Sequence, residues 1–244
     1  MPRSCCRCGD IKESPNLTEV PLKNMMTQDY KALPEAEHGI QGVLPAHIGA
    51  AETTKTVSRL PGTAKTEGAT EADPLLAPVL PETNLIVSDT GELRRDRKAK
   101  VATIDSPRTK AVYGFLGAAG EIKLNGLTVR CKSPFAVIAL SSLTNESIGD
   151  SDNILLTAVG RADNTAATYN DDHTIQYDKG NGPIEAEVIV AEIEIDTTLA
   201  NFRVDAINTH GMQVGPTPAD EKDGKLKFTI GGDFPSIYYL IQKI

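Results

Sequence analysis

The side chains of this sequence that could do chemistry are mainly carboxylates, and they gather in short polar segments. Three clusters stand out: Asp89 with Glu92, Asp171 with Asp172, and Asp220 with Glu221 and Asp223. Glycoside hydrolysis needs two carboxyl groups that face each other across one cleft, about 5–10 Å apart. Each cluster lies instead in a turn-like segment, where Asp and Glu usually bond to their own backbone or face water. The sequence therefore identifies no catalytic residue.

One polar loop, YNDDHTIQYD at residues 169–178, holds a histidine among acidic residues. Four of its side chains are of types that ligate divalent cations: Asp171, Asp172, His173 and Asp178. Their spacing is not that of an EF-hand loop, so we predict no metal site. No serine stands in a G-x-S-x-G elbow, and no phosphate-binding loop is present. We therefore predict neither a nucleophilic triad nor a cofactor.

The same region contains the aromatic residues best suited to bind a sugar. Carbohydrate-binding proteins hold sugar rings against flat aromatic side chains, and this chain has no Trp. Most Phe and Tyr residues fall in predicted strands, where we expect the core to take them, but Tyr169 and Tyr177 flank His173 in the loop. Arg161 and Asn164 follow a predicted buried strand, and we favour a structural role for them, in which they pin the loop to its backbone. One hypothesis nevertheless groups all five residues in a carbohydrate site.

The cysteines indicate neither a disulfide framework nor a zinc site. Cys5, Cys6 and Cys8 crowd the N-terminal end, whereas Cys131 stands alone. A disulfide framework distributes cysteines through the fold, and a structural zinc site takes four ligands in spaced pairs. The role of the three crowded thiols stays open.

The charge balance excludes several classes of partner. The chain has 25 basic and 33 acidic residues, for a net charge of -8. Nucleic acids and anionic membranes both attract basic surfaces, so we predict neither as a partner. No apolar stretch approaches the roughly 20 residues of a membrane-spanning helix. The N-terminal residues lack the apolar region of a secretory signal. The compartment stays open, with a secreted or periplasmic parent enzyme as one alternative.

Prolines and aromatic residues divide the chain into two parts. Nine of the 15 prolines fall at or before Pro81, whereas ten of the 11 aromatic residues follow it. The first part is rich in Ala, Thr, Glu, Gly and Pro, and it has few large side chains to offset the entropy of ordering. We therefore expect a mostly irregular or disordered segment over 1–80 and one folded domain over 81–244.

The second part has the pattern of an all-β protein. Short apolar or alternating runs recur between turn residues, and Asn125-Gly126 is the dipeptide favoured in two-residue hairpins. Gly114, between two aromatic residues, marks a bulge or a close approach of the backbone. The run 184–195 alternates throughout, but its apolar residues change face midway, which predicts a bulge near Val190. About ten strands at such spacing predict a jelly-roll-like β-sandwich.

Four segments, in this order, resemble the C-terminal β-sandwich that follows the catalytic barrel in certain large bacterial glycoside hydrolases. They are SDTGELRRD (88–96), ATIDSPRTKAVYGFLG (102–117), GLTVRCKSPFAVIALSSL (126–143) and NILLTAVGRADNT (153–165). In such enzymes the catalytic carboxylates belong to an upstream (β/α)8 barrel, which typically needs about 250 residues. Residues 1–80 supply neither that length nor its pattern. The resemblance therefore implies an accessory domain without activity of its own, and whether the chain is a truncated fragment stays open.

Three functional hypotheses follow. The leading one is a non-catalytic accessory sandwich that stabilises or docks onto the catalytic barrel of a polysaccharide-degrading hydrolase. The first alternative is an independent carbohydrate-binding module that uses Tyr169, His173 and Tyr177. The second alternative is a structural or adhesive β-domain with a protein partner, for which we expect a large exposed apolar patch on one sheet.

Overall fold

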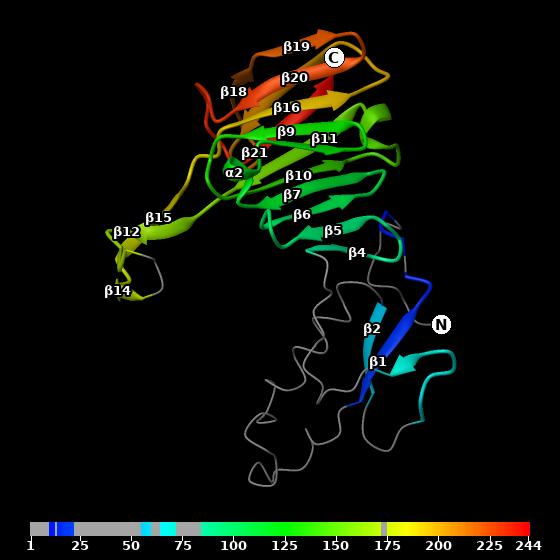
Figure 1. The fold of residues 1–244 in the computed structure, drawn as a ribbon. Helices are drawn as coiled ribbons and strands as arrows, with labels where there is room; N and C mark the ends of the chain where they lie inside the picture. Colours follow the sequence, from blue (N-terminus) through cyan, green and yellow to red (C-terminus); the bar gives the residue numbers. More distant parts are fainter. Residues whose placement is uncertain (1–9, 13, 22–54, 60–63, 72–83, 172–174) are drawn as a thin grey trace. The chain divides into compact units, whose positions relative to one another are not determined.

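The computed structural model describes residues 10–12, 14–21, 55–59, 64–71, 84–171 and 175–244 (Figure 1). Strands make up most of the secondary structure, and the described helices are two single turns, α2 (Leu116–Ala119) and η3 (Ile148–Asp150). None of the described helices is long and apolar enough to cross a membrane. The chain divides into two compact units, Met1–Lys98 and Ala99–Ile244.

The first unit contains a small parallel sheet and a hairpin. Its strands are β1 (Leu17–Pro21), β2 (Lys55–Arg59), β3 (Thr70–Glu71), β4 (Leu85–Val87) and β5 (Leu93–Asp96). β1 lies between β2 and β3 and is parallel to both, whereas β4 and β5 are antiparallel. The segment 1–80, expected from the sequence to be irregular, thus includes three strands, and most of its other residues lie outside the described ranges.

The second unit is a sandwich of two antiparallel sheets. The strands of these sheets are β6 (Val101–Asp105), β7 (Thr109–Gly114), β8 (Glu121–Leu124), β9 (Leu127–Cys131), β10 (Ala136–Ser142), β11 (Asn153–Val159), β16 (Ala191–Asp196), β17 (Phe202–Ile207), β18 (Gln213–Thr217), β19 (Ala219–Lys222), β20 (Lys225–Ile230) and β21 (Tyr238–Lys243). The large sheet runs β18-β17-β21-β11-β10-β7-β6, and the small sheet runs β19-β20-β16-β9-β8. The hairpins β6–β7, β10–β11 and β17–β18 belong to the large sheet, and the hairpins β8–β9 and β19–β20 belong to the small sheet. The predicted all-β sandwich-like fold is confirmed, with shorter and more numerous strands than expected.

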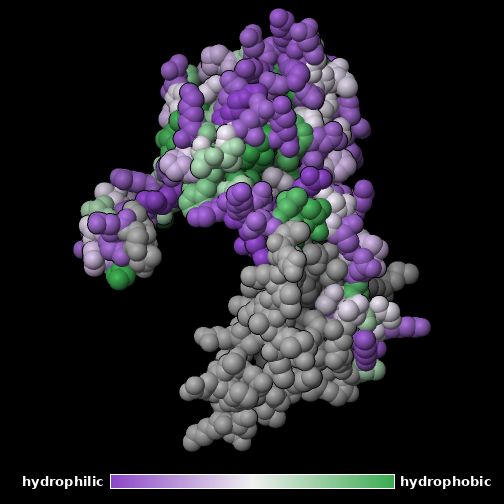
Figure 2. Space-filling model, viewed as in Figure 1, coloured by the Kyte–Doolittle hydropathy of each residue, from purple (hydrophilic) through white to green (hydrophobic). Residues whose placement is uncertain are grey.

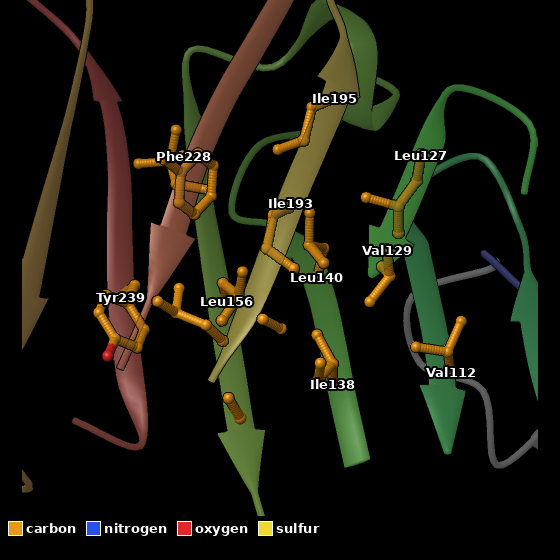
Figure 3. Packing of buried hydrophobic residues seen from close by; sticks show 14 of the residues in the cluster. Val112, Leu127, Val129, Ile138, Leu140, Leu156, Ile193, Ile195, Phe228 and Tyr239 are labelled. Carbon is orange, nitrogen blue, oxygen red and sulfur yellow. The ribbon is translucent and has the colours of Figure 1, made fainter. Parts of the chain in front are cut away.

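The core lies between the two sheets, as Figure 3 shows. Every second side chain of a strand points inward, so Leu140 and Leu156 of the large sheet and Ile193 and Phe228 of the small sheet belong to one buried cluster. Tyr239 is fully buried among them. Its hydroxyl oxygen accepts hydrogen bonds from backbone N–H groups of the β20–β21 loop, so the buried polar atom is satisfied.

The face switch in the run 184–195 arises from a break in the strand and not from the predicted bulge. The strand β15 (Asn181–Ala186) ends before the switch, and β16 begins after it, at Ala191. Between them, Ile189 is buried in the core, and the backbone of Val190 bonds to residues 132 and 133 beside the small sheet. The sequence suggested one strand because the alternation continues unbroken through two strands that belong to different sheets.

Two predicted backbone features are confirmed. Asn125 and Gly126 form the two-residue turn between β8 and β9, because Leu124 pairs with Leu127. Gly126 has a φ of 74°, whereas Asn125 does not have the positive φ that both central residues of the favoured hairpin turn adopt. Gly114 has a φ of 125°, and a Cβ atom at this position would lie 2.1 Å from the carbonyl oxygen of Lys100. The backbone of β7 therefore passes so close to the turn before β6 that no side chain fits.

We expect the substitution Gly114→Ala to destabilise the sandwich by about 3 kcal/mol or more, because it adds both backbone strain and a steric clash. Gly126→Ala is the matched control. It also places alanine at positive φ, but its Cβ would meet only the Cβ of Asp196, at 3.9 Å, and we expect a cost of about 1 kcal/mol. Urea unfolding followed by circular dichroism measures both. Equal costs would contradict the close approach at Gly114.

Candidate functional site

The polar loop that the sequence singles out is part of a hairpin that extends from the sandwich between β11 and β16 (Figure 1). We call residues 161–188 the arm; its described strands are β12 (Ala162–Thr165), β13 (Thr168–Tyr169), β14 (Gln176–Asp178) and β15. β12 pairs with β15, and β13 pairs with β14. Both pairings are antiparallel and each contains a register shift.

At the base of the arm, residues at its two ends are joined to each other by hydrogen bonds. The amide of Glu187 donates to the carbonyl oxygen of Arg161 at 2.8 Å, and the amide of Arg161 donates to Oε2 of Glu187 at 3.2 Å. A Cβ on Gly160 would lie 2.7 Å from Cδ1 of Ile189. A side chain at Gly160 would therefore require the ends of the Ile189 and Glu187 side chains to shift.

Nearly all of the arm faces solvent. Gly180 is the single buried residue among the described residues of the arm. Tyr177 is 70% exposed and Ile184 is 71% exposed, and Ile175 is exposed as well. A two-stranded hairpin without a packed face is marginally stable in water. The arm thus presents large apolar side chains that no described residue covers.

A polar network links the strands of the arm. The hydroxyl of Tyr169 donates to Oδ1 of Asp163 at 2.6 Å and accepts a hydrogen bond from Nε2 of Gln176 at 2.9 Å. The bond to the Asp163 carboxylate raises the pKa of Tyr169, because a phenolate would lose this acceptor and face a second negative charge. The positive charge of Arg161 acts in the opposite direction. The neutral phenol is therefore the form that the arm stabilises.

The five residues proposed for a carbohydrate site differ in their exposure and in their hydrogen bonds. Nδ2 of Asn164 donates to the carbonyl oxygen of Lys179 at 3.0 Å, a bond from side chain to backbone that pins the arm. Arg161 lies at the base, and Tyr169 is partly buried and hydrogen-bonded. Tyr177 alone offers an open aromatic surface. His173 lies outside the described residues, so its position in the site stays a prediction.

Two exposed aromatic residues were missed by sequence reasoning. Phe228 and Tyr239 are buried as expected, but Phe115 and Phe135 are 48% and 40% exposed. Their rings meet edge to face with centroids 5.7 Å apart, and Nζ of Lys100 lies 5.4 Å from the centroid of Phe115. Phe115 follows Gly114 at the end of β7, and Phe135 follows Pro134 just before β10. The neighbouring Gly or Pro is the feature of the sequence that could have indicated that these rings lie outside the core.

The acidic cluster of Asp89 and Glu92 joins its own turn to residues 12, 14 and 16 of the chain. Asp89 accepts hydrogen bonds from Oγ of Ser14 at 2.5 Å and from Nδ2 of Asn16 at 2.8 Å. These bonds lower the pKa of Asp89, because they stabilise its charged form. Oε2 of Glu92 accepts from the amide of Lys12 at 2.8 Å. Both carboxylates are thus engaged within the first unit.

Two further carboxylates near these acidic clusters bond to backbone. Glu221 accepts hydrogen bonds from the amides of Asn201 and Phe202, at the start of β17. Asp178 accepts from the amide of Gly180 at 2.9 Å, in a local turn. Among the described residues, no group of three or more His, Cys, Asp or Glu side chains could hold a metal ion. The crowded thiols of Cys5, Cys6 and Cys8 lie outside that part of the chain.

Comparisons with known proteins identify no relative. No family model matches the chain, and neither a curated protein nor a solved structure has significant similarity to it. The geometry of the arm and of the sheets is therefore the basis for functional proposals.

The raised pKa of Tyr169 can be tested on the arm itself. We expect Asp163→Ala to lower the pKa of Tyr169 toward the value of a free tyrosine, because the charged acceptor is gone. A folded-state pKa that is raised stabilises the neutral form, so this contribution is complete below the unfolded pKa and is lost as the pH rises through the folded one. NMR titration of ring-labelled tyrosine measures both effects. A Tyr169 pKa that is unchanged by Asp163→Ala would show that the hydrogen bond does not form.

Proposed function

We propose that the chain is a non-catalytic accessory β-sandwich of a polysaccharide-degrading glycoside hydrolase, and that its arm docks onto the catalytic barrel of the parent enzyme. We infer the existence of this barrel from the resemblance of the four ordered segments to the C-terminal sandwich of such enzymes. The observation that carries the docking is the arm, a hairpin with exposed Tyr177, Ile184 and Ile175 and with one buried glycine among its described residues.

Physical reasoning favours a covered arm. Isolated hairpins are marginal in water, and exposed apolar side chains gathered on one element mark an interaction site. The apolar residues of the arm lie among acidic ones, such as Asp178 and Glu185. A docking surface that matches it has an apolar centre and a basic rim, because complementary charge favours association and orients the partners.

The absence of a catalytic pair in the described acidic clusters fits this role. Asp89, Glu92 and Glu221 all accept hydrogen bonds from neighbouring segments. A carboxyl group that acts in catalysis must instead face a substrate across a cleft. In this proposal the chemistry of the parent enzyme belongs to its barrel.

We expect the purified chain to release no nitrophenol from a panel of p-nitrophenyl glycosides.

We expect the purified chain to bind a separately expressed catalytic barrel of the resembled class whose own sandwich has been removed. Replacing Tyr177 and Ile184 together with Ala should raise the dissociation constant about 100-fold, because exposed aromatic and aliphatic anchors dominate such interfaces. Isothermal titration calorimetry measures the affinity, and Lys227→Ala on the small sheet is the control.

Turnover of any aryl glycoside that disappears when one acidic residue is replaced would refute the accessory role. Binding to the barrel that is indifferent to the arm variant would refute docking through the arm but leave the accessory role standing.

A second candidate, an independent carbohydrate-binding module, is favoured by the exposure of Tyr177. A ring that is 70% exposed offers both an apolar surface and a hydroxyl group to a sugar. The hydrogen-bonded set of Asp163, Tyr169 and Gln176 lies on the same hairpin and supplies polar groups beside it.

Affinity electrophoresis in gels that contain a panel of polysaccharides tests this candidate. Binding through the arm predicts retarded migration of the chain on at least one glycan and loss of this retardation in Tyr177→Ala. Phe135→Ala removes a different exposed ring and is the matched control. Normal migration on every glycan excludes the module.

A further inference from the structure

The outer faces of the two sheets differ in kind. On the small sheet, outward side chains form a network of ion pairs: Arg130 with Glu121 and Glu192, Lys225 with Glu194, and Lys227 with Glu192. Figure 2 shows hydrophilic residues gathered over this part of the second unit. These bonds lower the pKa of Glu194, chiefly through Lys225, and raise the pKa of Arg130. This face is built to remain in contact with water.

The large sheet has no such network over its central strands. On β7, β10, β11 and β21, all of which are described throughout, the side chains that alternate with core residues carry no charge. The largest of them are Tyr113, Val137, Leu155, Val159, Tyr238 and Leu240; the others are Ala, Ser, Thr, Asn and Gln. We call this surface the large-sheet face. Most of its residues are partly exposed, and Tyr113 is 44% exposed.

The apolar residues of the large-sheet face are aligned across strands. Val137 pairs with Tyr113 on one side and with Val159 on the other, which makes a row across β7, β10 and β11. Leu155 pairs with Leu240 across β11 and β21. Within each row the paired side chains are neighbours on one face. Between the two rows lie Ala139, Thr157 and Tyr238, which pair across the same strands and are uncharged. Antiparallel sheets commonly carry polar side chains on the solvent face, as the small sheet does here.

At β17, which borders the large-sheet face, the charged side chains are paired with each other. Asp205 points away from the core and is nevertheless buried. Its carboxylate accepts hydrogen bonds from Nε of Arg203 and from Nε2 of Gln213, both at 2.5 Å. The large-sheet face is therefore bordered at β17 by a paired charge, which a neighbouring surface can approach without meeting an unpaired ion.

We propose that the large-sheet face binds a second copy of this chain and forms a twofold-symmetric dimer. The reason is charge. The chain carries a net charge of -8, and two identical copies repel each other wherever their charged surfaces meet. The large-sheet face is uncharged over four adjacent strands, so two copies meet there without repulsion and without removing water from ions. An isologous contact needs only that one patch be complementary to itself.

Sheet geometry fits the same partner. Two sheets with the same twist pack face to face at about −30°, with their side chains interdigitated. Two copies of one sheet have the same twist by identity, and the rows led by Val137 and Leu155 supply the side chains that interdigitate. The large-sheet face is also the apolar patch on one sheet that a structural β-domain with a protein partner leads us to expect. The proposal does not depend on the arm or on the proposed enzyme role.

Sedimentation equilibrium of the whole chain tests the dimer directly. We expect a concentration-dependent equilibrium between monomer and dimer. Leu155→Lys places a charge in the middle of the face in both copies and should raise the dimer dissociation constant about 100-fold or more. Thr229→Lys adds the same charge to the exposed outer face of the small sheet and should leave the dissociation constant unchanged.

A second variant covers the case in which lysine disturbs the fold. Val137→Thr with Leu155→Thr keeps residues that favour strands and should weaken the dimer about tenfold, with an unchanged circular dichroism spectrum. A chain that stays monomeric at its highest soluble concentration overturns the proposal. So does a dimer that both face variants leave intact. A monomeric chain that binds the separate barrel and loses this binding in Leu155→Lys overturns it as well, and assigns the large-sheet face to the barrel.

Discussion

Burial of apolar side chains between the two sheets is the interaction on which the rest of this protein depends. Residues such as Leu156, Ile193 and Phe228 are removed from water together, and each fully buried side chain of this kind contributes about 1.5–3 kcal/mol. Because side chains alternate along a strand, fixing the inward residues also fixes which residues point outward. The core therefore determines where the charged face, the large-sheet face and the arm can be.

The outward residues are free of that constraint, and they differ sharply from place to place. On the small sheet they form a ladder of ion pairs around Arg130, whereas on the large sheet the rows that contain Val137 and Leu155 are uncharged. Solubility requires only that outward residues be compatible with water. An apolar face that solubility does not require points to association, as do exposed Tyr177 and Ile184 on a hairpin with almost no buried residue.

Sequence reasoning succeeded where local chemistry determines structure. The Asn125-Gly126 turn and the close approach at Gly114 follow from backbone conformations that only certain residues adopt. It failed at the run 184–195, because two strands of different sheets happen to continue one alternation, and it missed the exposure of Phe115 because burial depends on contacts far away in sequence. The short strands β12, β13 and β14 of the arm went unnoticed since most of their side chains face solvent, so no apolar alternation marks them. Tyr169 and Tyr177 were rightly placed in one polar region, but their separate environments depend on bonds such as the one to Asp163.

The closed base of the arm has a consequence for how the protein can change. The amide of Glu187 bonds to the carbonyl oxygen of Arg161, so the two ends of the arm meet at its base. A segment whose two ends lie close together can be lengthened or shortened at small entropic cost, because loop-closure entropy depends only weakly on length. The sandwich would thus tolerate insertion, deletion or exchange at this point without loss of its core. Evolution, or a protein engineer, can therefore replace this one hairpin while the sandwich keeps its core.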